Sequence, residues 1–145
     1  MTEAGSDPLI GRLQALLPDD GAHVDSPLVL AYVGDAVFEL AVRTYLATHS
    51  RARVNELHQQ AKDKVRASAQ AEALGDIEEL LTDEERDIVR RARNTKVHVP
   101  KSASLYEYRY STAFEALLGH LFLAGRLERL VYLLKLVIPK GETET

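Results

Sequence analysis

The sequence predicts an all-α protein, and three observations support this class. Apolar residues recur at helical spacing along most of the chain, helix-capping signals precede several of the apolar runs, and no segment reads convincingly as a strand. With 145 residues, of which 46% are hydrophobic and 28% charged, the composition is that of one ordinary globular domain. No apolar run reaches about 18 uninterrupted residues, so no transmembrane helix is expected.

Charge and cysteine content narrow the classes of function. The chain has no cysteine, which excludes disulfides, thiolate metal sites and cysteine nucleophiles. The N-terminus is acidic and lacks an apolar signal core, so we expect a cytoplasmic protein with no membrane partner. The net charge of −4 argues against a nucleic-acid binder when taken as a whole, but the charges are unevenly distributed.

Two helices are expected in the first third of the chain. Residues 9–17 have an amphipathic pattern, and Ser26 with Pro27 begins a second helix, over 27–48, that is apolar nearly all round and should be centrally buried. Gly34 costs about 1 kcal/mol in a helix interior, so it should permit the close approach of another backbone. A carboxylate among apolar neighbours, Asp35, then needs a cation, a metal or a donor.

Further helices are expected in the middle and at the end of the chain. Residues 51–74 form a long helical pattern that Gly75 should end, and a capping box at 82–85 should begin a helix that reaches about residue 93. Residues 97–110 have no helical period and predict a loop, in which 106–110 alternate like a short extended piece.

The C-terminal part should contain two helices. Ser111 or Thr112 should cap an apolar helix that Gly125 closes, and a last helix should cover residues 127–137. We therefore divide the chain into an N-terminal segment, a main domain and a polar tail, with bounds 1–24, 25–139 and 140–145.

A cluster of basic residues follows the acidic part of the chain. Five bases without an intervening acid occupy twelve positions: Arg90, Arg91, Arg93, Lys96 and Lys101. They can be the cationic end of a helix that favours its own dipole, followed by a solvated loop. They can also form an arm that contacts phosphates. Charge alone favours the first interpretation.

A second carboxylate lies in an otherwise apolar helix. Glu115 is the only acid in 112–124, and Gly119 follows one turn later. If the two apolar helices cross through Gly34 and Gly119, the two carboxylates meet, and Mg²⁺ or Mn²⁺ would suit such an oxygen-only site. Two alternatives remain: Glu115 also fits a capping box, and the aspartate at position 35 could be satisfied by an arginine or by backbone donors.

Two motifs resemble signatures of the ribonuclease III family. Residues 30–37 (LAYVGDAV) resemble the first and residues 114–119 (FEALLG) the second, in the right order and at the right separation. Residues 93–96 (RNTK) and 108–115 (YRYSTAFE) are similar, more narrowly, to Mini-ribonuclease III, a subfamily with the catalytic domain but no double-stranded-RNA-binding domain. The likeness covers about residues 25–139.

The resemblance implies a fold, an assembly and a reaction. These are the helical ribonuclease III endonuclease-domain fold, an obligate homodimer, and cleavage of double-stranded RNA that depends on Mg²⁺, with Mn²⁺ as a substitute. It assigns the catalytic and metal-binding roles to Asp35 and Glu115. Ala31 and Thr112 stand where the family usually has carboxylates; the subfamily looks similar at both, which implies fewer protein ligands and leaves a second metal site open.

The resemblance also implies RNA contacts and a cellular role. The implied RNA-binding segment consists of Arg90, Arg91, Arg93, Asn94, Lys96 and Lys101. The bases between residues 51 and 66 would form a second patch. The implied role is maturation of the ends of the 23S ribosomal RNA precursor in the cytoplasm, with a ribosomal protein as an accessory partner. The alternatives are a dimer of the same fold that binds structured RNA without cleaving it, and a helical scaffold.

Overall fold

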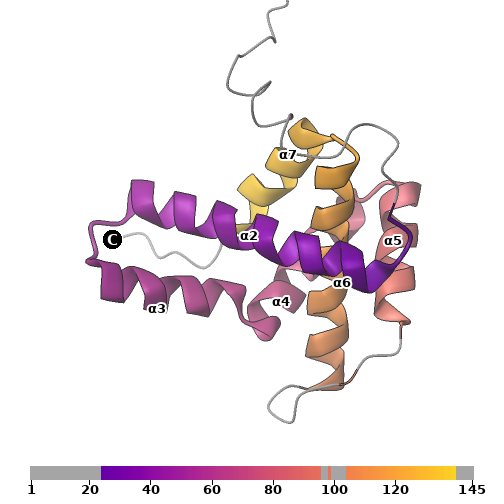
Figure 1. Ribbon diagram of the computed structural model, residues 1–145, viewed down its shortest axis with the longest axis horizontal. Helices are drawn as coiled ribbons and strands as arrows, with labels where there is room; N and C mark the ends of the chain where they lie inside the picture. Colours follow the sequence, from indigo (N-terminus) through magenta and orange to yellow (C-terminus); the bar gives the residue numbers. More distant parts are fainter. Residues whose placement is uncertain (1–23, 96–97, 99–103, 140–145) are drawn as a thin grey trace, which may run out of the picture.

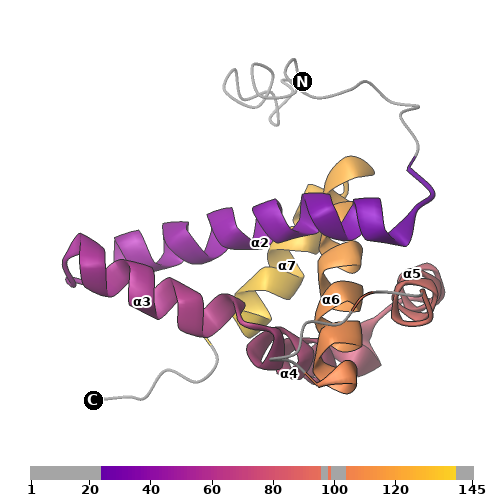
Figure 2. The same cartoon turned by 60° about the horizontal axis from the view of Figure 1, so that its bottom comes forward.

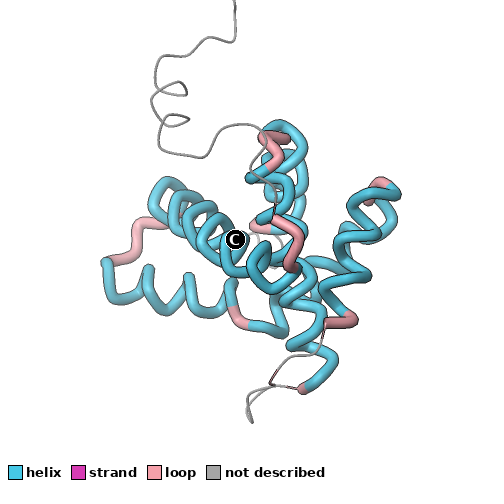
Figure 3. Tube along the Cα trace, turned by 45° about the vertical axis from the view of Figure 1, so that its right-hand side comes forward, coloured by secondary structure: helices cyan, strands magenta, loops and turns pink. Residues whose placement is uncertain are grey.

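The computed structural model describes residues 24–95, 98 and 104–139. These residues form six α-helices and one short 3₁₀-helix, without a strand (Figures 1 and 3). The all-α prediction is therefore confirmed, while the helix predicted over residues 9–17 lies outside the described residues. The elements in order are α2 (Pro27–His49), α3 (Val54–Val65), α4 (Ala67–Ile77), η1 (Glu78–Leu80), α5 (Asp83–Arg93), α6 (Leu105–Leu123) and α7 (Leu127–Val137).

Helix α6 is the centre of the fold. It packs against α2, α4, α5 and α7 (Figures 1 and 2). The side chains of Phe114, Leu117 and Leu121 on it are completely buried. The expectation that the helix near residues 27–48 would be the buried centre is wrong. Helix α2 buries only one stripe, and Tyr32 and Leu40 on its other side are 80% and 69% exposed.

The start of α2 follows the predicted capping pattern. The side chain of Ser26 accepts a hydrogen bond from the backbone N–H of Val29 at 3.3 Å, and Pro27 occupies the first turn, where its missing N–H is not needed. The C-terminal half of α2 lies beside α3, and this helical pair extends away from α5 (Figures 1 and 2). The N-terminal half of α2 is left to cross α6.

The long helix predicted over residues 51–74 is broken at Arg66. This residue is extended, with φ −66° and ψ 158°, so that α3 ends at Val65 and α4 begins at Ala67. Gly75 lies inside α4 instead of ending it. No glycine or proline marks the break. The carbonyl of Val65 at the end of α3 is satisfied locally, because the side-chain amide of Gln70, five residues later, donates to it at 2.8 Å.

Helix α5 has the predicted capping box and is tied to α7. Thr82 Oγ1 accepts from the backbone N–H of Glu85 at 3.2 Å, and the Glu85 carboxylate accepts from the Thr82 N–H at 3.0 Å. The same carboxylate is 1% exposed and accepts two hydrogen bonds from Arg129, at 2.9 and 2.8 Å. Arg129 also donates to the Leu80 carbonyl, so one guanidinium links three elements.

The N-terminal end of α6 corrects the prediction of a loop through residue 110. Ser104 caps the helix, with its Oγ accepting from the N–H of Glu107 at 3.0 Å. The tyrosines that looked like an alternating strand stack at helical spacing, because Tyr106 and Tyr110 lie one turn apart with ring centroids 4.3 Å from each other. At the other end the prediction is confirmed: Gly125 adopts φ 74° just after the helix.

Candidate active site

Helices α2 and α6 cross at backbone contact through two glycines. A Cβ atom on Gly34 would lie 1.7 Å from the carbonyl oxygen of Glu115, and one on Gly119 would lie 2.0 Å from that of Leu30. Neither distance leaves room for any side chain, so only glycine permits this approach. The ring pair of Phe38 and Phe114, with centroids 5.1 Å apart and perpendicular planes, packs beside the crossing. The predicted glycine-mediated crossing is confirmed.

The crossing brings Asp35 and Glu115 together, as the sequence predicted. Glu115 is mostly buried at the crossing, whereas Asp35 is exposed, contrary to the expectation of a buried aspartate. Burial, together with a hydrogen bond and charge repulsion from Asp35, raises the pKa of Glu115 from 4.5 to about 8. The hydrogen bond between the two side chains therefore stabilises the protonated form of Glu115.

Gln70 is a third member of the site that the sequence did not indicate. It lies on α4, its side chain is 2% exposed, and its amide donates to Glu115, which opposes part of the rise in the pKa of that carboxyl. Glutamine in a helix is usually a surface residue, so nothing in the local pattern marks this one. It reaches Glu115 because the chain breaks at Arg66 and redirects α4 against α6.

The structure argues against the capping box as the reason for Glu115 and against an arginine partner for Asp35. Thr112 lies inside α6, eight residues after the Ser104 cap, so Glu115 does not belong to a capping box. Asp35 has Glu115 as its neighbour at the crossing, and the ion pairs among the described residues do not include an arginine bound to Asp35. The two carboxylates thus lie together without a compensating positive side chain.

The donor set of this site fits Mg²⁺. Two carboxylates are hard ligands, and Mg²⁺ is typically held by one or two carboxylates while it keeps several waters. The described residues contain no group of three or more histidine, cysteine or acidic side chains placed to hold a metal ion. A cation would also relieve the repulsion that raises the pKa of Glu115.

The two positions that lack the family's usual carboxylates lie next to the crossing. Ala31 and Thr112 are each 6% exposed, on α2 and α6 respectively. Ala31 has no ligand atom, and the Thr112 hydroxyl is a neutral one. The site therefore offers few charged oxygen ligands beyond Asp35 and Glu115.

The described part of the predicted RNA-binding cluster is partly neutralised within the protein. Arg90 and Arg91 both pair with Asp87, on the same face of α5. The guanidinium of Arg93 lies over the ring of Tyr110, 5.4 Å from its centroid, and donates to the tyrosine hydroxyl at 3.4 Å. These arginines remain at least partly exposed, so their charges can still reach a phosphate.

The remaining members of the cluster extend beyond α5. Asn94 follows the last residue of α5 and is exposed. Lys96 and Lys101 lie outside the described residues. In the second basic patch, between residues 51 and 66, Lys64 turns inward and donates to the Ile138 carbonyl at 2.8 Å, so it is held against α7.

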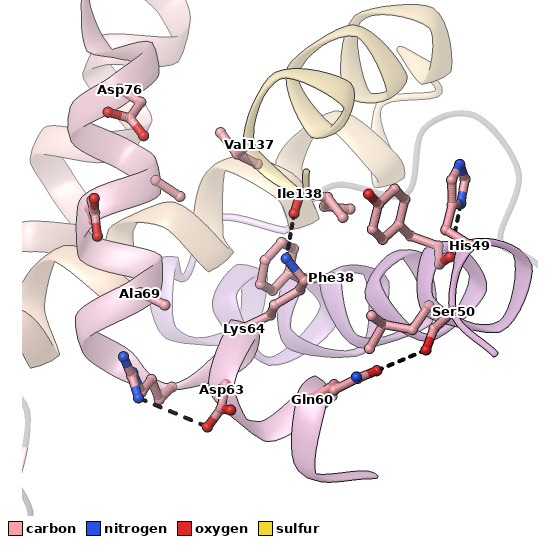
Figure 4. Close-up of a pocket in the computed structure, with 15 residues that line it drawn as sticks. Phe38, His49, Ser50, Gln60, Asp63, Lys64, Ala69, Asp76, Val137 and Ile138 are labelled. Carbon is pink, nitrogen blue, oxygen red and sulfur yellow. Dashed lines mark hydrogen bonds and ion pairs between the residues drawn. The ribbon is translucent and has the colours of Figure 1, made fainter. Parts of the chain in front are cut away.

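A pocket of about 510 Å³ between α2, α3, α4 and the end of α7 is separate from the carboxylate pair (Figure 4). Neither Asp35 nor Glu115 lines it. Its polar lining mixes both signs of charge, including Asp63 paired with Arg66 at 3.9 Å. We find no convergence of reactive groups in it.

The fold and the site match known proteins. Residues 28–126 match the family model of the ribonuclease III domain. The chain is 48% identical over 124 residues to Mini-ribonuclease 3 of Thermoanaerobacter sp. (strain X514), covering 85% of this chain and 87% of the relative. It is 52% identical over 105 residues to Mini-ribonuclease 3 of Symbiobacterium thermophilum, covering 72% and 81%.

A solved structure agrees with this likeness. The crystal structure of a protein from Fusobacterium nucleatum aligns with a TM-score of 0.73 at 35% sequence identity, covering 81% of this chain and 94% of that one. None of the helices among the described residues is long and apolar enough to cross a membrane.

Proposed function

This chain belongs to the ribonuclease III family, and we propose that it is a Mg²⁺-dependent endoribonuclease that cleaves double-stranded RNA. The observation that carries the proposal is the crossing of α2 and α6, where two glycines hold Asp35 and Glu115 in contact. Both carboxylates fall within the two motifs that resemble the family signatures. Asp35 and Glu115 would hold the cation and are the proposed catalytic residues, with Mn²⁺ as a substitute for Mg²⁺.

The two carboxylates would play unequal parts. When bound, Mg²⁺ supplies the positive charge that activates a water nucleophile and stabilises the leaving oxygen of the phosphodiester. Asp35 is exposed, so it faces the side from which a duplex can approach. Glu115 is mostly buried and must release the proton that it shares with Asp35 before it can bind a cation. Donation from Gln70 favours that ionised form.

We also propose that two copies associate through the exposed face of α2. Val29, Tyr32, Ala36 and Leu40 follow helical spacing along this face and are all exposed, Tyr32 to 80%. Large apolar side chains on one face of a helix favour a protein interface. Two copies would present two sites, one for each strand of a duplex, and a monomer in sedimentation at micromolar concentration would contradict this assembly.

The proposed substrate contacts follow from charge. Arg90, Arg91, Arg93 and Asn94, with Lys96 and Lys101 beyond the described residues, would bind the phosphate backbone, which suits a duplex read by shape. By its likeness to Mini-ribonuclease 3, we extend the proposal to the ends of the 23S ribosomal RNA precursor, in the cytoplasm and with a ribosomal protein as accessory partner.

A cleavage assay with matched variants tests the proposal. Labelled duplex RNA with Mg²⁺ should be cut by the wild-type protein. Asp35→Asn and Glu115→Gln should each abolish cutting while binding in a gel-shift assay survives. Glu128→Gln, an exposed change on α7, serves as the control and should cut at the wild-type rate. A Glu115→Gln protein that cuts at the wild-type rate would refute the proposal that cleavage needs both carboxylates.

The same assay separates the second candidate function. The small residues at Ala31 and Thr112 favour a dimer that binds structured RNA without cleaving it, since they provide no carboxylate. Such a protein would shift the duplex in the gel but leave it intact at every Mg²⁺ and Mn²⁺ concentration.

A further inference from the structure

Gln70 is a buried amide whose orientation is fixed by the backbone. Its Nε2 donates to the Val65 carbonyl at 2.8 Å, and a carbonyl oxygen can accept only from the NH₂ end of the amide. The Oε1 atom is then turned away from the Val65 carbonyl. There it is buried, and it has no hydrogen-bond partner among the described residues.

Packing alone does not explain an amide at this position. A buried acceptor without a partner destabilises the folded state, because it has lost its hydrogen bonds to water. Methionine fills a similar volume and would remove this penalty. The hydrogen bond to Val65 caps the end of α3, but a cap at that carbonyl requires only the NH₂ group.

The same NH₂ group donates to the carboxyl of Glu115. Gln70 therefore connects the more buried of the two carboxylates to the junction between α3 and α4. An outer hydrogen-bond partner of this kind fixes the orientation of a metal ligand. Ala31 and Thr112 provide no further carboxylate, so the orientation of Glu115 matters directly for the site.

We propose that Gln70 is a positioning residue of the cation site. Its NH₂ group holds the Glu115 carboxylate in the orientation that binds Mg²⁺, and its Oε1 accepts a hydrogen bond from a water in the hydration shell of the cation. Mg²⁺ retains several waters when two carboxylates bind it, and each of those waters needs an acceptor. This inference rests on the proposed function of the site.

Calorimetric titration of the metal-free, full-length protein with Mg²⁺ and with Mn²⁺ tests the inference. Gln70→Met should bind the cation about 10–100-fold more weakly than the wild type, as is usual when an outer hydrogen-bond partner is removed. Its melting temperature in EDTA should stay within about 5 °C of the wild-type value or rise. Gln59→Met, the same change at an exposed position on α3, should alter neither quantity. Wild-type affinity in Gln70→Met would overturn the inference.

Two further proteins separate this inference from the proposed function. If the wild type binds the cation and Glu115→Gln does not, the proposed cation site is supported. Unchanged binding in Gln70→Met would then reject only the proposed role of Gln70. If the wild type does not bind, both proposals fail. If Gln70→Met does not fold, NMR of the wild type provides the test. The side-chain NH₂ signals of Gln70 should shift when Mg²⁺ is added to the wild type and should not shift when it is added to Asp35→Asn. Signals that stay in place in the wild type would overturn the inference.

Discussion

Replacing Gly34 with alanine should separate the two carboxylates without changing either of them. The new Cβ would lie 1.7 Å from the Glu115 carbonyl oxygen and 2.9 Å from the Gly119 nitrogen. Ordinary contact begins at 3.4 Å, so α2 and α6 must move apart by the difference, 1.7 Å, along that direction. Neither obstructing atom can rotate away, because both belong to the backbone of a buried helix.

The expected decrease in stability follows from these contacts. Overpacking a core usually costs about 1–3 kcal/mol, and a clash with rigid backbone belongs at the upper end of that range or above. The higher helix propensity of alanine offsets about 1 kcal/mol. We therefore expect a net decrease of about 2 kcal/mol or more in the free energy of unfolding. In a domain of this size that lowers the melting temperature by about 5–15 °C.

The measurement pairs Gly34→Ala with Gly75→Ala. Gly75 also lies in a helix, but a Cβ there would meet nothing within 4 Å, so this control should gain about 0.5–1 kcal/mol. Urea unfolding in EDTA gives both free energies, and calorimetry then gives the Mg²⁺ affinity of each folded protein. Gly34→Ala should bind Mg²⁺ more weakly, whereas Gly75→Ala should bind like the wild type.

The reasoning would be refuted by a Gly34→Ala protein with wild-type stability and wild-type Mg²⁺ affinity. That result would mean that the helices tolerate the side chain and that their separation does not set the site. If Gly34→Ala is less stable but binds Mg²⁺ with unchanged affinity, the close crossing is supported and its role in binding the cation is rejected.

Three further predictions concern charge. Without divalent cations, the raised pKa of Glu115 means that the contribution of this carboxyl to stability is fully present below about pH 4.5 and is lost as the pH rises to about 8, by up to about 5 kcal/mol. Glu115→Gln should lack this part of the pH dependence in melting curves taken across that range. Replacing Arg90 and Arg91 with alanine should weaken binding to duplex RNA and make its salt dependence shallower, by about one unit in the slope of log binding constant against log salt concentration for each phosphate that the protein no longer binds. An unchanged slope would mean that both arginines are only a solvated helix end. Arg129→Leu should destabilise the protein by about 3–5 kcal/mol in urea unfolding, because it leaves the buried Glu85 carboxylate without its positive partner. Adding Glu85→Gln to this variant should restore much of the stability.

Much of the fold was predictable because its helix ends carry local signals. Ser26 with Pro27, the capping box at Thr82, and Gly125 each act through neighbouring residues, and all three occur where the sequence placed them. The break at Arg66 was not predictable, because no glycine or proline marks it and an ordinary residue adopts the extended conformation there. The early start of α6 was missed because the tyrosines between residues 106 and 110 fit both a strand period and a helical stack.

The site was predictable where polar residues interrupt an apolar pattern. Gly34 and Asp35 stand out within α2, as Glu115 and Gly119 do within α6, and a close crossing is the simplest arrangement that explains all four. Gln70 was not found, because its importance depends on the path of α4 after the break. The exposure of Asp35 was also missed, since an apolar run does not reveal which of its sides remains uncovered.

The backbone contact at Gly34 and Gly119 also has a consequence for local motion. The carboxylates are carried by the segments of α2 and α6 that touch through their backbones, and the α6 segment is buried in the core, so opening the site requires those two helices to come apart. Amide hydrogens in such a segment exchange with solvent only through large-scale unfolding. The amides of residues 115–119 should therefore exchange as slowly as any in the protein, and the carboxylate pair and the hydrophobic core should open as a single cooperative unit.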